Sequence, residues 1–147
     1  MVVIQTEPRF GYSARPAQSA LEITVLFTKV RATLTALRCA ASLARDLGAT
    51  VRILNVRVVP YPLPLDRPPT DRDVLATNIS KLADGQSMPA RIEIWFGRDV
   101  VDSLLQSLSP SSIVLVGAKT RWWPTKERRW AKQMTGHGHQ VIFVSER

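Results

Sequence analysis

Residues 112–119 read Ser-Ile-Val-Leu-Val-Gly-Ala-Lys. An apolar run that ends at a glycine is typical of a buried strand followed by a turn. Beyond the turn come Trp122, Trp123 and Pro124 and then a strongly basic segment. Since proline suits the first turn of a helix, we expect a helix to begin there. A strand, a glycine turn and a helix in this order form the part of an α/β protein that commonly binds phosphate.

The same alternation extends over the chain from residue 21 onward. Apolar and β-branched runs predict five strands, at residues 22–28, 51–59, 91–96, 113–116 and 141–144. Helical spacing and capping residues predict four helices. The first carries Leu34, Leu37, Ala41, Ala44 and Leu47 and ends at Gly48, and the second carries Val74, Leu75, Ile79 and Leu82 between Thr70 and Gly85. The third follows Asp99 and carries Val100, Val101, Leu104, Leu105 and Leu108, and the fourth carries Trp130 and Met134. Strands that alternate with helices of this length imply right-handed crossovers. The fold class is therefore α/β, a doubly wound, Rossmann-like parallel sheet with helices on both faces.

The chain of 147 residues has the size of one domain, and its 45% apolar and 22% charged residues are ordinary for a globular protein. Residues 1–20 contain Pro8, Gly11 and Pro16 without a sustained period, so we expect an extended arm with a short strand at residues 2–4, followed by one domain at residues 21–147. The sequence shows neither an apolar run of membrane-spanning length nor a signal peptide, and we expect a cytoplasmic protein. The single Cys39 excludes an internal disulfide.

Positive charge is concentrated toward the C-terminus. The chain carries a net charge of +8, and the part from Gly117 onward supplies +5 of it, from seven basic and two acidic residues. Such an excess attracts anions or acidic membrane surface. In doubly wound sheets, ligands bind beyond the carboxyl ends of the strands where the strand order reverses. The borders of that crevice are predicted to be residues 28–31 and 117–123.

Four segments resemble the universal stress protein family: residues 23–27; residues 51–59 with the proline-rich loop after them; the block Phe96-Gly97-Arg98-Asp99-Val100-Val101; and Ile113-Val114-Leu115-Val116-Gly117. Together they cover most of residues 21–144. The resemblance implies a five-stranded doubly wound sheet of order 3-2-1-4-5. It also implies a role in stress response and a homodimer formed through the last strand, residues Val141, Ile142, Phe143 and Val144.

The chain departs from the ATP-binding members of that family at the two motifs that hold the nucleotide. Those members have an aspartate after strand one, where Thr28 stands here. They also have Gly-x2-Gly-x9-Gly-Ser/Thr after strand four, and counting from Gly117 places Thr120, Trp130 and Ala131 at the later positions. Glycine loops work because bare backbone approaches the phosphates and donates N–H groups to them. We therefore expect no cofactor, and in particular no ATP.

The remaining polar and aromatic residues are interpreted as structural. Asp99 and Asp102 stand at a helix start, where capping explains them. His137 and His139 lack acidic or cysteine partners in sequence and are predicted to form a turn, not a metal site. Cys39 is predicted to be a small core side chain, and the pair Trp122-Trp123 to staple a helix. Because no nucleophile, metal cage or acid and base pair emerges, we expect that the protein is not an enzyme.

Three functional hypotheses follow from this sequence. The first is a non-catalytic domain, similar to universal stress proteins, that acts through dimerisation and partner binding with a degenerate nucleotide site. The second is a nucleotide or anion sensor, with Thr28 and Lys29 on one wall of the crevice and Gly117, Lys119, Thr120 and Arg121 on the other. The third is a soluble regulatory module of a membrane transporter, whose basic helix faces acidic lipid. Specific binding of nucleic acid is not expected.

Overall fold

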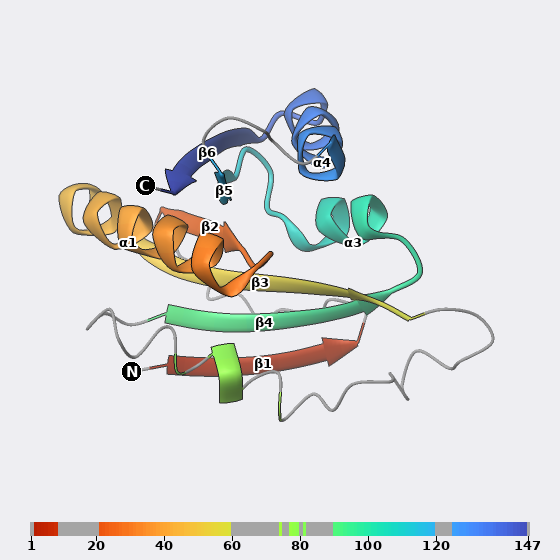
Figure 1. Cartoon of the computed structure of the whole chain (residues 1–147), viewed down its shortest axis with the longest axis horizontal. Coiled ribbons are helices and arrows are strands. Elements are labelled where there is room, and N and C mark those ends of the chain that lie inside the picture. Colours follow the sequence, from red (N-terminus) through yellow and green to blue (C-terminus); the bar gives the residue numbers. More distant parts are fainter. Residues whose placement is uncertain are drawn as a thin grey trace.

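A single parallel sheet organises the protein (Figure 1). The structure is a computed structural model that describes residues 2–8, 21–59, 74, 77–79, 81, 90–119 and 125–146. Its strands are β1 (Val2–Pro8), β2 (Glu22–Leu26), β3 (Thr50–Val58), β4 (Ala90–Gly97), β5 (Ile113–Lys119) and β6 (Gln140–Glu146). They lie in the order β1-β4-β3-β2-β5-β6, and every neighbouring pair is parallel.

The five predicted strands therefore form the expected order 3-2-1-4-5, and β1 adds a sixth strand beside β4. β1 is longer than the short strand expected at residues 2–4, because its pairing with β4 continues from Val2 opposite Ala90 to Pro8 opposite Phe96. The division of the chain at residue 20 stays a prediction, since residues 9–20 lie outside the described part.

Helices cover both faces of the sheet, as predicted. One face carries α1 (Val30–Leu47), and the other carries α3 (Val100–Ser107) and α4 (Thr125–Gly136) (Figure 1). The α1-side core joins buried residues of α1 to the sheet: Ile23, Val25, Ala36, Leu37, Ala40, Ala44, Val51, Ile53, Val59, Ile79, Ala90, Ile92, Ile94, Phe96 and Leu115. The α3-side core joins Leu26, Leu54, Trp95, Leu104, Leu108, Val114, Val116 and Met134. The alternation of side chains along each strand assigns neighbouring residues to opposite cores.

α1 ends where the sequence predicted. Gly48 adopts the left-handed conformation with a φ of 65°, and its backbone N–H donates to Ala44 O. The buried side of α1 is rich in small residues, among them Ala36, Ala40 and Ala44. Small side chains let a helix axis approach a sheet closely, so α1 lies near the backbone of the strands that it covers.

α3 begins at the predicted cap, because Asp99 Oδ1 accepts a hydrogen bond of 3.0 Å from Asp102 N. Leu104 and Leu108 are buried as expected, while Val100, Val101 and Leu105 are only half-buried. Their place in the helix interface is taken partly by Ser103 and Ser107, whose hydroxyls donate to the backbone at Asp99 O and Leu104 O. Internal hydrogen bonds of this kind let small polar residues lie in a core.

The segment between β3 and β4 is described in part only. Residues 74, 77–79 and 81 are helical, and Ile79 is buried in the α1-side core as predicted. The prediction that Val74 belongs to the buried face is wrong, because 53% of this residue is exposed. Thr70, Leu75, Leu82 and Gly85, which were expected to cap, fill and end this helix, lie outside the described residues, as do Trp122, Trp123 and Pro124.

Candidate functional site

The two predicted walls of the crevice meet at the start of α1. Thr28 and Lys29 follow β2 directly, and Thr28 N donates to Thr33 Oγ1 at 3.0 Å, which ties the loop to the first turn of the helix. Lys29 occupies the N-cap without a side-chain capping bond and is exposed. Thr28 Oγ1 is buried and has no hydrogen-bond partner. At this end of the sheet, the buried hydroxyl of Thr28 therefore has no hydrogen-bond partner, and the amino terminus of α1 has no side-chain cap.

Gly117 lies in β5, not in the turn where the sequence placed it. It pairs with Val144 of β6, and β5 continues to Lys119. A Cβ at Gly117 would overlap the backbone carbonyl of Ala32 in the first turn of α1. Glycine is needed here because α1 approaches the strand closely. The close approach is enough to explain Gly117, and no phosphate site is required. The contact also shows that the loop after β2 and the end of β5 are neighbours.

Two of the positions that would hold ATP in a glycine loop lie in a helix instead. Trp130 and Ala131, which stand at the third and fourth motif positions when Gly117 is the first, lie within α4. Ala131 is buried, and Trp130 is half-buried and packs against the α3-side core. These residues do not fit a backbone cradle for phosphates. The side chain of Lys119 and residues Thr120 and Arg121, the remaining candidates for this wall, lie outside the description.

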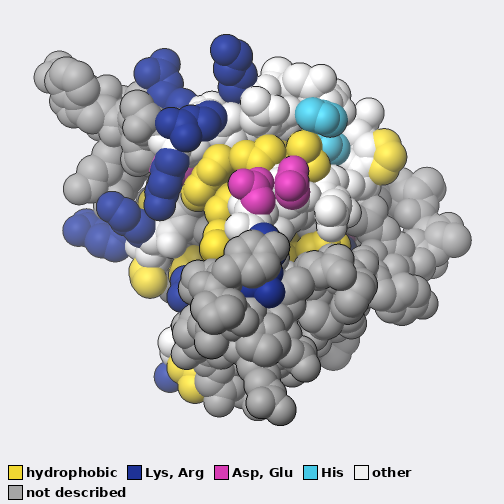
Figure 2. Space-filling view, turned by 90° about the vertical axis from the view of Figure 1, so that its right-hand side faces the viewer, with side chains coloured by type: hydrophobic (Ala, Val, Ile, Leu, Met, Phe, Trp, Pro, Cys, Tyr) yellow, Lys and Arg dark blue, Asp and Glu magenta, His cyan; other side chains and the backbone are white. Residues whose placement is uncertain are grey.

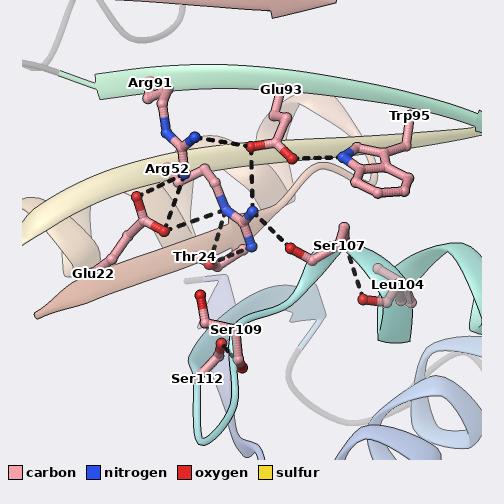
Figure 3. A network of polar contacts seen from close by, with 10 residues as sticks. All are labelled: Glu22, Thr24, Arg52, Arg91, Glu93, Trp95, Leu104, Ser107, Ser109 and Ser112. Carbon is pink, nitrogen blue, oxygen red and sulfur yellow. Dashed lines mark hydrogen bonds and ion pairs between the residues drawn. The ribbon is translucent and has the colours of Figure 1, made fainter. Parts of the chain in front are cut away.

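The most extensive polar arrangement lies elsewhere, at the amino ends of β2, β3 and β4 (Figure 3). Arg52 on β3 is fully buried, yet its guanidinium has several partners. Arg52 Nη1 donates to Ser107 O at 2.9 Å and to Glu93 Oε2 at 3.3 Å, and Nε and Nη2 donate to Thr24 Oγ1 at 3.3 and 3.2 Å. Arg52 thereby joins three strands to the last residue of α3.

Arg91 and Glu22 complete this ionic cluster. Arg91 Nη2 contacts Glu22 Oε2 at 2.9 Å, and Arg91 Nη1 contacts Glu93 Oε2 at 3.3 Å. Glu93 also accepts a hydrogen bond of 2.6 Å from Trp95 Nε1. Two arginines and two glutamates leave the cluster without net charge, which a buried ionic group requires. We define Glu22, Arg52, Arg91 and Glu93 as the ionic cluster.

The ionic cluster is structural in character. It lies at the amino ends of the strands, whereas ligands of doubly wound sheets bind at the carboxyl ends. Its carboxylates are paired with arginines and are not held as free acids or bases. Sequence reasoning missed it, although a signal was present: charged residues alternate with apolar ones inside strands that must be buried on both faces, as in Arg91-Ile92-Glu93-Ile94.

The edge strand β6 carries the residues that were predicted to form a dimer interface. Val141, Ile142, Phe143 and Val144 are all half-buried. Val141 and Phe143 pack against the α3-side core, while Ile142 and Val144 pack against the α1-side core. Gln140 N donates to Ser112 O, so the backbone groups of Val141, Phe143 and Ser145 point away from β5, toward the side of β6 where no other described strand lies.

His139 links the beginning of β6 to the beginning of β5. Only 7% of this residue is exposed, and its Nδ1 accepts a hydrogen bond of 3.2 Å from Ser112 N. Because Nδ1 is an acceptor, the ring proton of the neutral form lies on Nε2. Burial, and secondarily the nearby His137, lower the pKa of His139 below its ordinary value of 6.5. The predicted turn at His137 and His139 is confirmed, and His139 also has a packing role that the sequence did not indicate.

This geometry predicts that the folded protein loses stability on mild acidification. The unfolded chain binds a proton on His139 near pH 6.5, whereas the folded protein binds it only at lower pH. The contribution of His139 to the stability of the folded protein is therefore fully present above pH 6.5 and is lost as the pH falls through the folded pKa. Below that pKa, His139 causes no further change in stability. His139→Asn keeps an acceptor for Ser112 N–H but does not titrate. In chemical unfolding, the free energy of unfolding of this variant should change less than that of wild type between about pH 7.5 and 5.5. His137→Gln, at an exposed position, should retain most of the drop; equal pH profiles for wild type and His139→Asn would contradict this account.

The described part of the chain shows neither a metal site nor a membrane-spanning helix. No group of three His, Cys, Asp or Glu side chains lies close enough there to hold a metal ion. Cys39 is half-buried against the α1-side core. None of the helices in the described ranges is both long and apolar enough to cross a membrane.

Comparison with known proteins identifies the architecture. No protein-family model matches the chain, and no curated protein matches it in sequence. In structure it is similar to a member of the universal stress protein family from Burkholderia pseudomallei, with a TM-score of 0.59 and 16% identity over 89% of this chain and 100% of the other. A universal stress protein from Archaeoglobus fulgidus in complex with dAMP has a TM-score of 0.54 and 12% identity, covering 87% of this chain and 100% of its own.

A further universal stress protein, solved in complex with cAMP, has a TM-score of 0.57 and 14% identity over 88% of this chain and 100% of its own. The similarity in each case extends over the whole of the other protein, while the identity stays low. The expected order of the five strands and the helices on both faces agree with this likeness. The chain therefore has the universal stress protein fold, built here on a sheet of six strands.

Proposed function

We propose that this protein is a non-catalytic binding domain that acts as a homodimer formed through β6. β6 is the outermost strand on its side of the described sheet, and this position is the observation that carries the proposal. Four consecutive apolar residues, Val141–Val144, stay half-exposed along it, and the strand contains no proline or lysine to discourage pairing. Edge strands of this composition pair with other strands unless something covers them. A two-fold axis beside β6 would pair it with its own copy and bury all four side chains.

The candidate catalytic groups support a binding role over an enzymatic one. Asp99 caps α3, His139 accepts from Ser112, and the carboxylates of the ionic cluster are matched by arginines. Two of the structural relatives are complexes with dAMP and cAMP. In this chain the last two positions of the glycine motif lie in α4, and the first, Gly117, is covered by the backbone of Ala32 in α1. We therefore assign no ATP-binding role to the crevice.

The dimer is tested by sedimentation velocity on a pair of matched double variants. Val141→Pro/Ser145→Pro removes two backbone N–H donors from the side of β6 that faces away from β5, and proline is tolerated on the outer side of an edge strand. Val141→Ala/Ser145→Ala truncates the same side chains and keeps both donors. We expect wild type and the alanine variant to sediment as dimers at micromolar concentration, and the proline variant as a monomer of similar Tm. ATP in excess should change neither the Tm nor the sedimentation.

A monomeric wild type, or a proline variant that still forms dimers, would refute assembly through β6. A rise in Tm that is specific to one nucleotide would instead favour a sensor that uses Thr28 and Lys29, because a ligand that binds only the folded state raises the Tm.

A further inference from the structure

Four basic residues cover the outer side of α4. Lys126, Arg128, Arg129 and Lys132 are all exposed. With about 3.6 residues per turn, their positions span an arc of about 160° around the helix. Arg128 lies at one end of this arc and Lys126 at the other, with Lys132 and Arg129 between them. Along the helix axis the four residues span about 9 Å. We call them the basic arc.

The opposite side of α4 is buried. Glu127, Ala131 and Met134 lie on that side, and Met134 belongs to the α3-side core. Glu127 is the one acidic residue in the sequence of α4. The exposed side of the helix therefore carries positive charge alone.

The charge of the basic arc is available to an outside partner. Within the described part of the chain, no ion pair joins a residue of the arc to a carboxylate. Lys126 Nζ lies 5.5 Å from the centre of the Trp130 ring. This cation–π contact leaves the positive charge and the N–H donors of Lys126 able to bind a phosphate. Figure 2 shows Lys and Arg side chains gathered along one flank of the face that α4 borders.

We infer that the basic arc binds double-stranded DNA, by contacting the phosphates on both sides of the major groove without reading the base sequence. A helix with its side chains is about 10–12 Å wide, and the major groove of B-DNA is about 12 Å wide. The two ends of the arc can therefore reach opposite rims of the groove. Lys and Arg donate charge-assisted hydrogen bonds to phosphate oxygens, which carry no sequence information. This inference is independent of the proposed dimer.

The width of the arc favours a groove over a flat surface. Lys126 and Arg128 point in nearly opposite directions, so a flat anionic surface would contact mainly Lys132 and Arg129 between them. A helix that lies on a bilayer also inserts apolar side chains. The large exposed apolar residues of the described part all lie outside α4: Leu21, Val30, Leu47, Val58 and Val74. An RNA duplex has a major groove too narrow for side chains to enter. The inference therefore predicts a preference for duplex DNA over both duplex RNA and anionic lipid.

The neighbouring helix α3 limits the contact to the flank formed by α4. α3 packs against α4 and exposes Asp99 and Asp102, whose carboxylates repel phosphates. In Figure 2, two acidic side chains stand in an apolar area at the centre of the face. The part of the chain from Gly117 onward, which includes α4, supplies +5 of the net charge of +8. This charge attracts a polyanion to α4 and raises the rate of encounter.

Fluorescence anisotropy with a labelled DNA duplex of about 10 base pairs, one turn of the double helix, tests the inference. For four phosphate contacts, the logarithm of the affinity should fall with the logarithm of the salt concentration with a slope of about −3.6. Lys126→Gln/Arg128→Gln removes the two ends of the arc and should weaken binding about tenfold at low salt, with a slope of about −1.8. Changes in the base sequence of the duplex should have little effect.

A second variant separates a groove from a flat surface. Arg129→Gln/Lys132→Gln removes the middle of the arc and keeps the contact between Lys126 and Trp130. If α4 lies in a groove, both variants should lose affinity to a similar extent. A loss confined to the middle pair would show contact with a flat surface, and the inference would be wrong.

Arg38→Gln/Arg45→Gln is the matched control, because it removes the same charge from two exposed positions of another helix, α1. This control should bind DNA nearly as wild type does, and Tm measurements should show that all three variants fold. If the control loses as much affinity as the α4 variants, the attraction is a general effect of net charge. That result would overturn the inference, as would equal or tighter binding to an RNA duplex of the same length or to phosphatidylserine vesicles.

Discussion

Arg52→Met is expected to lower the free energy of unfolding by about 3 kcal/mol, which is a large share of the stability of a domain of this size. The substitution removes the one side chain that bonds Thr24, Glu93 and Ser107 O together. It leaves Glu93 buried with an excess of negative charge in the ionic cluster. Arg91 and Trp95 still contact Glu93, so we place the loss at the lower end of the range for a broken buried ion pair.

Denaturant unfolding measures this loss, with Arg57→Met as the control. Arg57 lies on the same strand and is exposed, so its replacement should change the stability by less than about 0.5 kcal/mol. Arg52→Met/Glu93→Gln restores neutrality and keeps an acceptor for Trp95 Nε1, and it should recover part of the stability. A cost below about 1 kcal/mol for Arg52→Met would mean that the cluster contributes little.

Gly117→Ala is expected to cost about 3 kcal/mol or to prevent α1 from packing on β5. The new methyl group would overlap the carbonyl of Ala32 and lie 3.0 Å from its Cα. These are backbone atoms, so no side-chain rotation relieves the overlap and the first turn of α1 must move. Unfolding experiments measure the loss, and circular dichroism shows whether the helix content changes.

Gly136→Ala is the control for this change, because a Cβ at Gly136 meets nothing within 4 Å. It should be neutral or slightly stabilising, since alanine restricts the unfolded chain more than glycine does. Ala32→Gly should not rescue Gly117→Ala, because the carbonyl of residue 32, and not its methyl group, makes the contact. If Gly117→Ala were as stable as wild type, the glycine would need another explanation, and a ligand at the crevice would be the first to test.

The sequence predicted those parts of the fold that depend on local pattern. Gly48 and Asp99 end and begin helices as expected, because capping is decided by a few neighbouring residues. The five strands were found from their apolar runs, although most of their boundaries moved by one to three residues. β1 was predicted only as a short strand, because its pairing with β4 depends on residues far away in the chain.

The polar features were harder to predict because they depend on which strands become neighbours. Arg52 and Glu93 are 41 residues apart and meet only after β3 and β4 pair. Gly117 suggested a phosphate turn when considered with its neighbours in sequence, whereas its contact is with Ala32, across the sheet.

The position of β1 has a consequence for how the protein is made. Val2 pairs with Ala90, so β1 leaves the ribosome long before the strand that it completes. Contacts between such distant segments slow folding, because a long loop must close before they form. During synthesis the outer edge of β4 stays open until β1 returns to it, and unpaired edges are where nascent chains aggregate. Pulse-labelling hydrogen exchange should accordingly find the amides of β1 among the last to gain protection.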